Sequence, residues 1–297
     1  MNFNQLLIFQ KVAELRHFTR AAQALYISQP AVSKQVHQLE KSLKQPLFTQ
    51  VGQKVHLTEA GKLLYDYAER IFALAAEAES ALSEMQQLEQ GRLMLGASTT
   101  IGTYLLPEWL VRYKDHYPGI DLVVEIGNTE EVQQKLLAHR LEVGLIEGSV
   151  THPELSEQAW QQDELVLIMQ PNYTHAVDEP QTIQQFLATH PPVILREQGS
   201  GTRSVLEKAL EHQGMEPIHP MIELGSTEAI KRAVAAGLGV SFVSEHTVRF
   251  EVASGYLKQI SLKDFIVQRS LSIVRLKGKR ISKAAQAFLQ LIETAVS

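Results

Sequence analysis

One proline constrains the fold of this chain more than any other residue. The stretch "FTRAAQALYISQPAVSKQVHQLE", residues 18–40, reads as helix on both sides of Pro30. Ser28 can cap a new helix, and a proline in the first turn costs little because the N–H there has no partner inside the helix. Apolar residues then recur every three or four positions. The pattern predicts two short helices joined by a tight turn, a helix-turn-helix.

The outer face of the second helix carries side chains that can read DNA. Opposite its apolar stripe are Gln29, Ser33 and His37, with Pro30 and Lys34 beside them. Glutamine can form two hydrogen bonds with adenine, serine and lysine can reach bases or phosphates, and proline can contact a thymine methyl. Residues 47–61 follow as a short hairpin with Lys54 at its tip, a candidate wing. The alternative is a helical pair whose polar face meets only water.

Charge is divided unevenly along the chain. Residues 1–57 carry seven basic side chains and two acidic ones, a net charge of +5. Because the whole chain has a net charge of −5, the remainder carries −10. A basic head on an acidic body is expected when only the head meets phosphate. The charge pattern therefore favours DNA binding by the first 57 residues.

Other classes of function lack their usual signals. The chain has no cysteine, and its eleven histidines show neither the His-x-His nor the His-x-x-x-His spacing of zinc sites. We therefore expect no metal and no cofactor. No run of about 18 apolar residues and no signal peptide stands out, so we expect a cytoplasmic protein without a membrane segment. The alternative function is an α/β enzyme, or a plain binding protein, for a phosphorylated or carboxylated small molecule; no Gly-x-Ser-x-Gly motif supports the enzyme.

A long helix should follow the head. Thr58 can cap it, and the chain then runs to about Gln90 without proline. Alternating three- and four-residue steps between apolar residues favour a helix that pairs two protomers, rather than a core helix of one domain. The residues of this heptad pattern are Leu64, Tyr67, Ile71, Leu74, Ala78, Ala81, Met85 and Leu88.

From Gly91 onward, short β-rich runs alternate with helical segments, which predicts an α/β domain with mostly parallel strands. Ligands of such sheets bind beyond the carboxyl ends of the strands. Free N–H groups and hydroxyls at four strand-to-helix turns suit a small anion, to which Arg203 adds charge unless it forms a structural ion pair. The turn residues are Ser98, Thr99 and Thr100; Asn128 and Thr129; Gln198, Gly199, Ser200, Gly201, Thr202 and Arg203; and Ser226 and Thr227.

The chain resembles the LysR-type transcriptional regulators over nearly its whole length, most clearly in "FTRAAQALYISQPAVSKQVHQLEKSLKQPLF" and the "LTEAG" that follows. The resemblance implies an all-α winged helix-turn-helix head at residues 1–60 and a dimerising linker helix at 58–90. An α/β two-lobed domain of the periplasmic-binding-protein type 2 should fill 91–297, with lobe I at about 91–164 and 268–297 and lobe II at about 165–267. It implies DNA contacts at Gln29, Pro30, Ser33, Lys34 and around Lys54. Gln50 stands where the family usually has arginine, so one contact to the DNA backbone should be weaker.

The resemblance also implies partners. A homodimer or homotetramer should bind a two-fold symmetric promoter site, with RNA polymerase as a candidate partner, and a small anionic effector should bind between the lobes. The crossings between lobes should lie near residues 163–166 and 265–270. Glu147, near this hinge, counts among the expected effector residues, unless it holds Arg203 or a hydroxyl instead. "GASTTIG", "GLIEG" and "REQGSGTR" look most like the branch that controls sulphur assimilation and sulphite reduction, which implies sulphite or sulphate. The carbon-fixation regulators come second and imply a phosphorylated metabolite.

Overall fold

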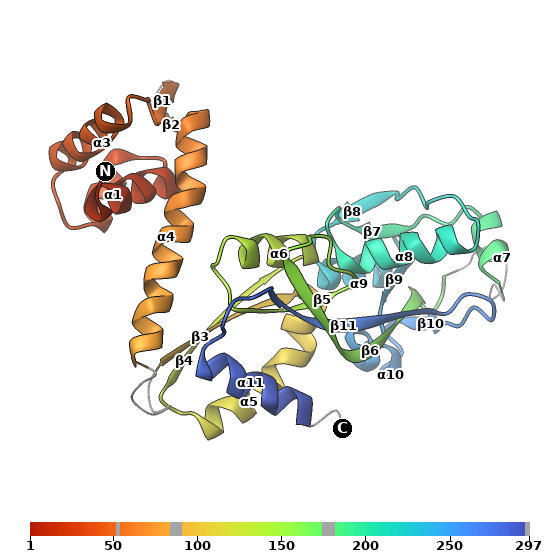
Figure 1. Ribbon diagram of the computed structural model, residues 1–297. Helices are drawn as coiled ribbons and strands as arrows, with labels where there is room; N and C mark the ends of the chain where they lie inside the picture. Colours follow the sequence, from red (N-terminus) through yellow and green to blue (C-terminus); the bar gives the residue numbers. More distant parts are fainter. Residues whose placement is uncertain (52–53, 84–90, 174–181, 295–297) are drawn as a thin grey trace. The chain divides into compact units, whose positions relative to one another are not determined.

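The computed structural model describes residues 1–51, 54–83, 91–173 and 182–294 (Figure 1). The chain divides into two units. The first, which we call the head, contains residues 1–81, and the second, which we call the body, contains most of residues 82–297. Within the described ranges, no helix is both long enough and apolar enough to cross a membrane.

The head is a three-helix unit followed by a hairpin. Its elements are α1 (Phe3–Leu15), α2 (Phe18–Ala24), α3 (Gln29–Leu43) and the antiparallel strands β1 (Phe48–Val51) and β2 (Lys54–Leu57). The predicted start of α3 is confirmed, because the Ser28 side chain accepts a hydrogen bond from the N–H of Ala31 and Pro30 lies in the first turn. The buried side chains that hold the three helices together include Leu6, Phe9, Val12, Ala21, Val32, Val36 and Leu39.

The long helix α4 (Glu59–Ser83) begins after Thr58, whose side chain accepts a hydrogen bond from the N–H of Gly61 at 2.9 Å. The predicted heptad does not form one continuous exposed seam, because Leu64 and Ile71 pack against the core of the head. Tyr67 and Leu74 are 52% and 60% exposed. In a straight helix of 3.6 residues per turn, the residues of a strict seven-residue repeat drift gradually around the helix axis. The head therefore covers one side of the apolar stripe of α4 and leaves the other side exposed. The side chains of Ala81, Met85 and Leu88 lie outside the described part of the chain.

The first lobe of the body, lobe I, is built on three parallel strands. The strands are β3 (Gly91–Ser98), β4 (Ile120–Gly127) and β5 (Val143–Glu147), with β3 between the other two. The short π-helix η1 (Ile101–Leu105) runs into α5 (Leu106–His116). Side chains of α5 and of α11 (Lys283–Thr294) share one apolar core with β3, whereas α6 (Thr129–Leu137) packs in a separate core. The carboxyl ends of β3, β4 and β5 therefore lie at one edge of the lobe.

Lobe II repeats this design on a smaller scale. Strands β7 (Ile194–Arg196) and β8 (Ile222–Leu224) are parallel, and each is followed by a helix, α8 (Gly201–His212) and α9 (Thr227–Ala235). The other elements of the lobe are α7 (Ile183–Ala188), β9 (Ser241–Ser244), the 3-10 helix η2 (Glu245–Thr247), α10 (Arg249–Ala253) and β10 (Lys258–Ile260).

Two long antiparallel strands connect the lobes. β6 (Leu155–Met169) and β11 (Val267–Leu276) run side by side through the body (Figure 1). At the lobe I end β11 pairs with β5, and at the lobe II end β6 pairs with β9 and β10. Asp163 of β6 stands directly opposite Arg269 of β11 in the ladder. These residues fall within the two segments where the sequence predicts that the chain crosses between lobes.

Candidate functional site

The first candidate site is the outer face of α3. Gln29, Pro30, Lys34 and His37 are exposed, and Ser33 is half-buried. The Gln29 side-chain amide donates a hydrogen bond to the Ser33 hydroxyl at 2.9 Å. The opposite face of the helix is buried in the head, so the polar face is free to enter a groove of DNA.

A carboxylate of α3 and a shared apolar core hold the hairpin next to this helix. Oε1 of Glu40, near the end of α3, accepts hydrogen bonds from the N–H groups of Leu47 at 2.8 Å and Phe48 at 3.3 Å. The rings of Phe9 and Phe48 also pack together, 5.3 Å apart. Lys54 is the first residue of β2, and its side chain, like that of Gln50 in β1, lies outside what the structure describes.

The second candidate site lies in the body, where three of the predicted turns meet around Glu147. Its Oε1 accepts hydrogen bonds from the Ser98 hydroxyl at 2.9 Å and from the N–H of Thr100 at 2.8 Å. Its backbone oxygen accepts one from the Thr129 hydroxyl at 2.8 Å. From lobe II, the hydroxyl of Thr202 donates to Oε2 at 2.9 Å.

Glu147 therefore holds hydroxyls of the turns, the alternative that the sequence left open for it. Its side chain is buried, and Arg269 donates to Oε2 at 2.8 Å, so both oxygens are occupied by the protein itself. Burial alone would raise the pKa of the Glu147 carboxyl, but the charge of Arg269 and three hydrogen bonds outweigh it and hold the pKa below its usual range. Glu147 therefore connects turns of both lobes through its hydrogen bonds.

Arg269 of β11 connects the hydrogen bonds around Glu147 to Asp163 of β6, where the two long strands cross between the lobes. Its Nε donates to Oδ2 of Asp163 at 2.7 Å, and Oδ1 of Asp163 accepts from the Ser244 hydroxyl at 2.8 Å. Arg269 and both of its acidic partners are buried. Sequence analysis missed Arg269, because only the register of β6 against β11 places it next to Asp163.

Arg203 takes the structural role that the sequence left open. Its Nε lies 2.8 Å from Glu207 and its Nη1 lies 2.7 Å from Glu223, so the charge is neutralised within lobe II. The same Nη1 donates to the backbone oxygen of Arg196 at 3.1 Å. The arginine therefore buttresses the end of β7 and does not supply the positive charge of the site.

Arg196 is the arginine that lies among the predicted hydroxyls. It is the last residue of β7 and only 3% exposed. Its Nη1 donates to the Thr227 hydroxyl at 3.1 Å, and its Nη2 donates to the Thr99 hydroxyl of lobe I at 3.3 Å. Sequence analysis missed this residue, although an arginine at the end of the buried run "PVILR" and before a glycine turn was a usable signal.

The remaining predicted residues shape the turns. Asn128 donates to Oε1 of Glu197 at 3.3 Å, and Ser226 caps α9. Gly199 has φ of 82°, and its carbonyl accepts a hydrogen bond from Glu130 of lobe I at 3.2 Å. Ser200 is buried before α8, whereas Gln198 is exposed and Gly201 begins the helix. Residues of all four predicted turns therefore lie within one connected network, which we call the cleft because the sequence predicts the effector's binding cleft at these turns.

A further contact between the lobes lies beside the cleft. The Tyr104 hydroxyl of η1 donates to Oε1 of Glu228 in α9, and Lys231 lies 2.7 Å from the same carboxylate oxygen. Burial, followed by the hydrogen bond to Glu228, raises the pKa of Tyr104 to about 12, so its hydroxyl stays protonated at neutral pH. This contact depends on the two lobes being close together.

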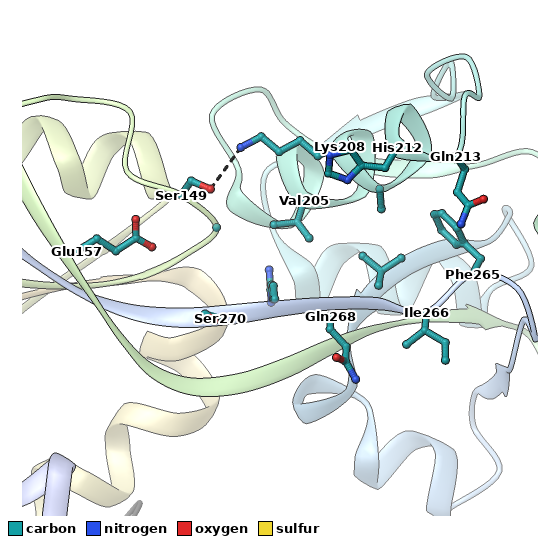
Figure 2. Close-up of a pocket in the computed structure, with 14 residues that line it drawn as sticks. Ser149, Glu157, Val205, Lys208, His212, Gln213, Phe265, Ile266, Gln268 and Ser270 are labelled. Carbon is teal, nitrogen blue, oxygen red and sulfur yellow. Dashed lines mark hydrogen bonds between the residues drawn. The ribbon is translucent and has the colours of Figure 1, made fainter.

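A separate cavity of about 500 Å³ lies between α8 and the crossing strands (Figure 2). Figure 2 shows Lys208 extending from α8 toward lobe I, where its Nζ donates to the Ser149 hydroxyl at 3.3 Å. Val205, His212 and Phe265 line the same cavity, and Arg269 borders it. None of the effector residues predicted from the sequence lines it, so this cavity is distinct from the cleft.

Comparison with known proteins identifies the class. Residues 3–62 match the model of the bacterial regulatory helix-turn-helix proteins of the lysR family, and residues 86–297 match the LysR substrate binding domain. The chain therefore belongs to the LysR family of DNA-binding transcriptional regulators, and it is a regulator with an effector-binding domain, not an enzyme.

Individual relatives agree with this assignment. A "Probable RuBisCO transcriptional regulator" of Cyanidioschyzon merolae is 35% identical and matches 97% of this chain and 96% of its own. The full-length CbnR structure in complex with its target DNA has a TM-score of 0.75 at 21% identity and matches 100% of both chains, a likeness of fold. The regulatory domain of Synechocystis CcmR in complex with 2-PG has a TM-score of 0.63 at 28% identity and matches 70% of this chain and 98% of its own.

Proposed function

We propose that this LysR-family regulator changes its promoter binding when a small anion enters the cleft of its body. One observation carries the proposal: the buried guanidinium of Arg196 reaches Thr99 of lobe I and Thr227 of lobe II. An anion held there would contact both lobes at once and favour one arrangement of them. A ligand can shift a conformational equilibrium only through such differential contacts, and typical couplings are about 1–3 kcal/mol.

On the DNA side, we propose that α3 lies in the major groove. Gln29, Ser33 and His37, with Pro30 and Lys34, would face the base edges and phosphates, because they form the face of α3 that the head does not bury. The hairpin that contains Lys54 follows closely and would touch the flanking backbone. The titratable side chains on this face, Lys34 and His37, are exposed, so they can approach phosphate without a cost of burial.

We also propose that α4 pairs with α4 of a second protomer. Leu63, Tyr67 and Leu74 are 61%, 52% and 60% exposed and lie on one face of this helix. Exposed apolar side chains at such spacing suit helix pairing. A two-fold dimer would place two α3 helices on half-sites about one turn of DNA apart, and a tetramer would pair two such dimers.

The relatives bear on the class of the effector. The relative named for RuBisCO regulation and the CcmR domain bound to 2-PG favour the carbon-fixation branch, which the sequence placed second. The sulphur branch, which the sequence placed first, finds no support in them. Sulphite and sulphate therefore stay in the proposal only as small oxyanions that could fit beside Arg196, alongside phosphorylated metabolites.

A thermal-shift titration tests the proposal. An anion that binds only the folded chain stabilises it by about 2.7 kcal/mol at a hundred times its Kd, which raises the Tm of a body of this size by about 5–10 °C. We expect this for at least one of 2-PG, phosphate, sulphite and sulphate, measured against sodium chloride of equal ionic strength. Thr227→Val removes the hydroxyl that contacts Arg196 and should lose the shift. Thr189→Val should keep the shift, because the Thr189 hydroxyl donates to a carbonyl oxygen of its own helix in lobe II. Equal shifts with sodium chloride and with every anion would contradict the proposal.

A further inference from the structure

The guanidinium of Arg196 already holds an oxyanion that belongs to the protein. Its Nε lies 2.8 Å from Oε2 of Glu197, and its Nη2 donates to Oε1 at 2.9 Å. Two parallel hydrogen bonds of this kind are the geometry in which arginine recognises a carboxylate or phosphate ligand. The Nε–Nη2 edge of the guanidinium, which could bind such a ligand, is therefore occupied by Glu197, the next residue in the chain.

The Glu197 carboxylate also lies where the two lobes meet. Besides Arg196 of lobe II, it accepts a hydrogen bond from Asn128 of lobe I at 3.3 Å. Burial opposes ionisation, but the hydrogen bonds and charge of Arg196 outweigh it and lower the pKa of Glu197, so the group is a carboxylate at neutral pH. It thus has the charge, the shape and the contacts with both lobes that an anionic effector would need.

We propose that Glu197 occupies the effector's place on Arg196 in the unliganded protein, and that the effector's own carboxylate or phosphoryl group displaces it. This inference rests on the proposed function, because it assumes an anion-binding cleft. The side chain of Glu197 is 28% exposed, whereas Arg196 is 3% exposed. Glu197 can therefore turn outward into water without becoming a buried charge, while Arg196 stays in place to receive the ligand.

Arg203 and Glu223 provide an internal comparison. They form a similar arginine–glutamate pair at 2.7 Å in the same lobe, but Arg203 holds a second carboxylate, Glu207, and no residue of lobe I. Glu197, in contrast, joins an arginine of lobe II to a polar group of lobe I. The Glu223→Gln variant therefore changes the same chemical group outside the cleft.

The experiment is calorimetric titration of the full chain with phosphate and, separately, with acetate at constant ionic strength. Glu197→Gln removes the competing charge and should tighten binding of the preferred anion about tenfold, because apparent affinity falls with the fraction of protein that is competent to bind. Glu223→Gln should leave the affinity unchanged. Arg196→Lys keeps a positive charge but loses the two-pronged geometry, and it should weaken binding at least about tenfold. If the titration with phosphate shows these changes, the site takes a phosphoryl group. If the titration with acetate shows them, it takes a carboxylate.

The outcomes separate this inference from the proposed function. If the wild-type chain binds an anion and Glu197→Gln binds it no more tightly, the displacement is overturned and the cleft proposal stands. If only Glu197→Gln binds, the displacement is supported directly. If neither chain binds either anion, the displacement is overturned, and the thermal-shift titration with the other anions decides the proposed function separately. A gain of affinity cannot result from misfolding, so the central result does not depend on the stability of the variant.

Discussion

Replacing Arg269 with methionine should lower the free energy of unfolding of the body by about 3–5 kcal/mol at pH 7, because removing one partner of a buried ion pair leaves the other charge uncompensated. Here two carboxylates would be left, since Arg269 donates to both Glu147 and Asp163. Methionine keeps much of the volume, so the loss should come from charge. Urea denaturation of the full chain measures it. Equal midpoints and slopes for wild type and variant would contradict this assignment.

The pH dependence of that loss is a second readout of the same change. The pKa of Glu147 is lowered in the folded chain, so its contribution to stability is present above the unfolded value of 4.5 and is lost as pH falls through the folded pKa. Without Arg269 the carboxyl would bind a proton more readily. The difference in unfolding free energy between wild type and Arg269→Met should therefore shrink from pH 7 toward pH 4.5. Arg269→Met combined with Glu147→Gln should recover part of the loss at pH 7, whereas a purely steric defect would show neither behaviour.

Gly201→Ala should weaken anion binding at least about tenfold and destabilise the body by about 1–3 kcal/mol, the usual range for overpacking. Gly201 is the first residue of α8 in lobe II, and a Cβ there would lie 2.0 Å from the backbone oxygen of Glu147 and 2.5 Å from the Thr129 hydroxyl, both in lobe I. A backbone atom cannot rotate out of the way, so the lobes must separate. Calorimetry with the anion that stabilises the wild-type chain and urea unfolding measure the two effects.

Gly225→Ala is the matched control for this change. It adds the same methyl group in the same lobe, but the nearest atom, Oε2 of Glu197, would be 3.9 Å away, an ordinary contact, so this variant controls for the effect on stability. We expect its free energy of unfolding to lie within about 0.5 kcal/mol of the wild-type value, because the added methyl group has no clash to relieve. If Gly201→Ala and Gly225→Ala behave alike, the close approach of the lobes at Gly201 is not important for the cleft.

The head could be predicted almost entirely from local sequence. Ser28 and Pro30 specify the start of α3 through the capping and dihedral rules of a few neighbouring residues, and the apolar spacing specifies which face is buried. The predicted seam of α4 was less reliable. Leu64 and Ile71 show the same spacing as Tyr67 and Leu74, and only the packing of the head covers the first pair.

The cleft could be predicted in part. Hydroxyls such as Ser98 and Thr129 were found because strand ends and helix starts are visible in the sequence. The roles of the arginines could not be decided from the sequence, because they depend on partners far away in the chain. Arg269 meets Asp163 through strand register, and Arg203 meets Glu223 because of the direction in which α8 presents its side chain. Arg196 differs because its neighbours come from both lobes, and its place at the end of a buried run before a glycine turn was the one local signal for it.

The most direct test of the account is the affinity of the full-length chain for a two-fold symmetric duplex, selected by the protein from a random pool, with and without the anion that stabilises the body. Gln29→Ala should lose about 1–3 kcal/mol of affinity for the selected site in both conditions, because it would remove the base contact that we propose for Gln29. For the wild-type chain the account predicts that the anion changes the Kd for the duplex by about 5- to 150-fold. The same Kd in the presence and absence of a bound anion would contradict it.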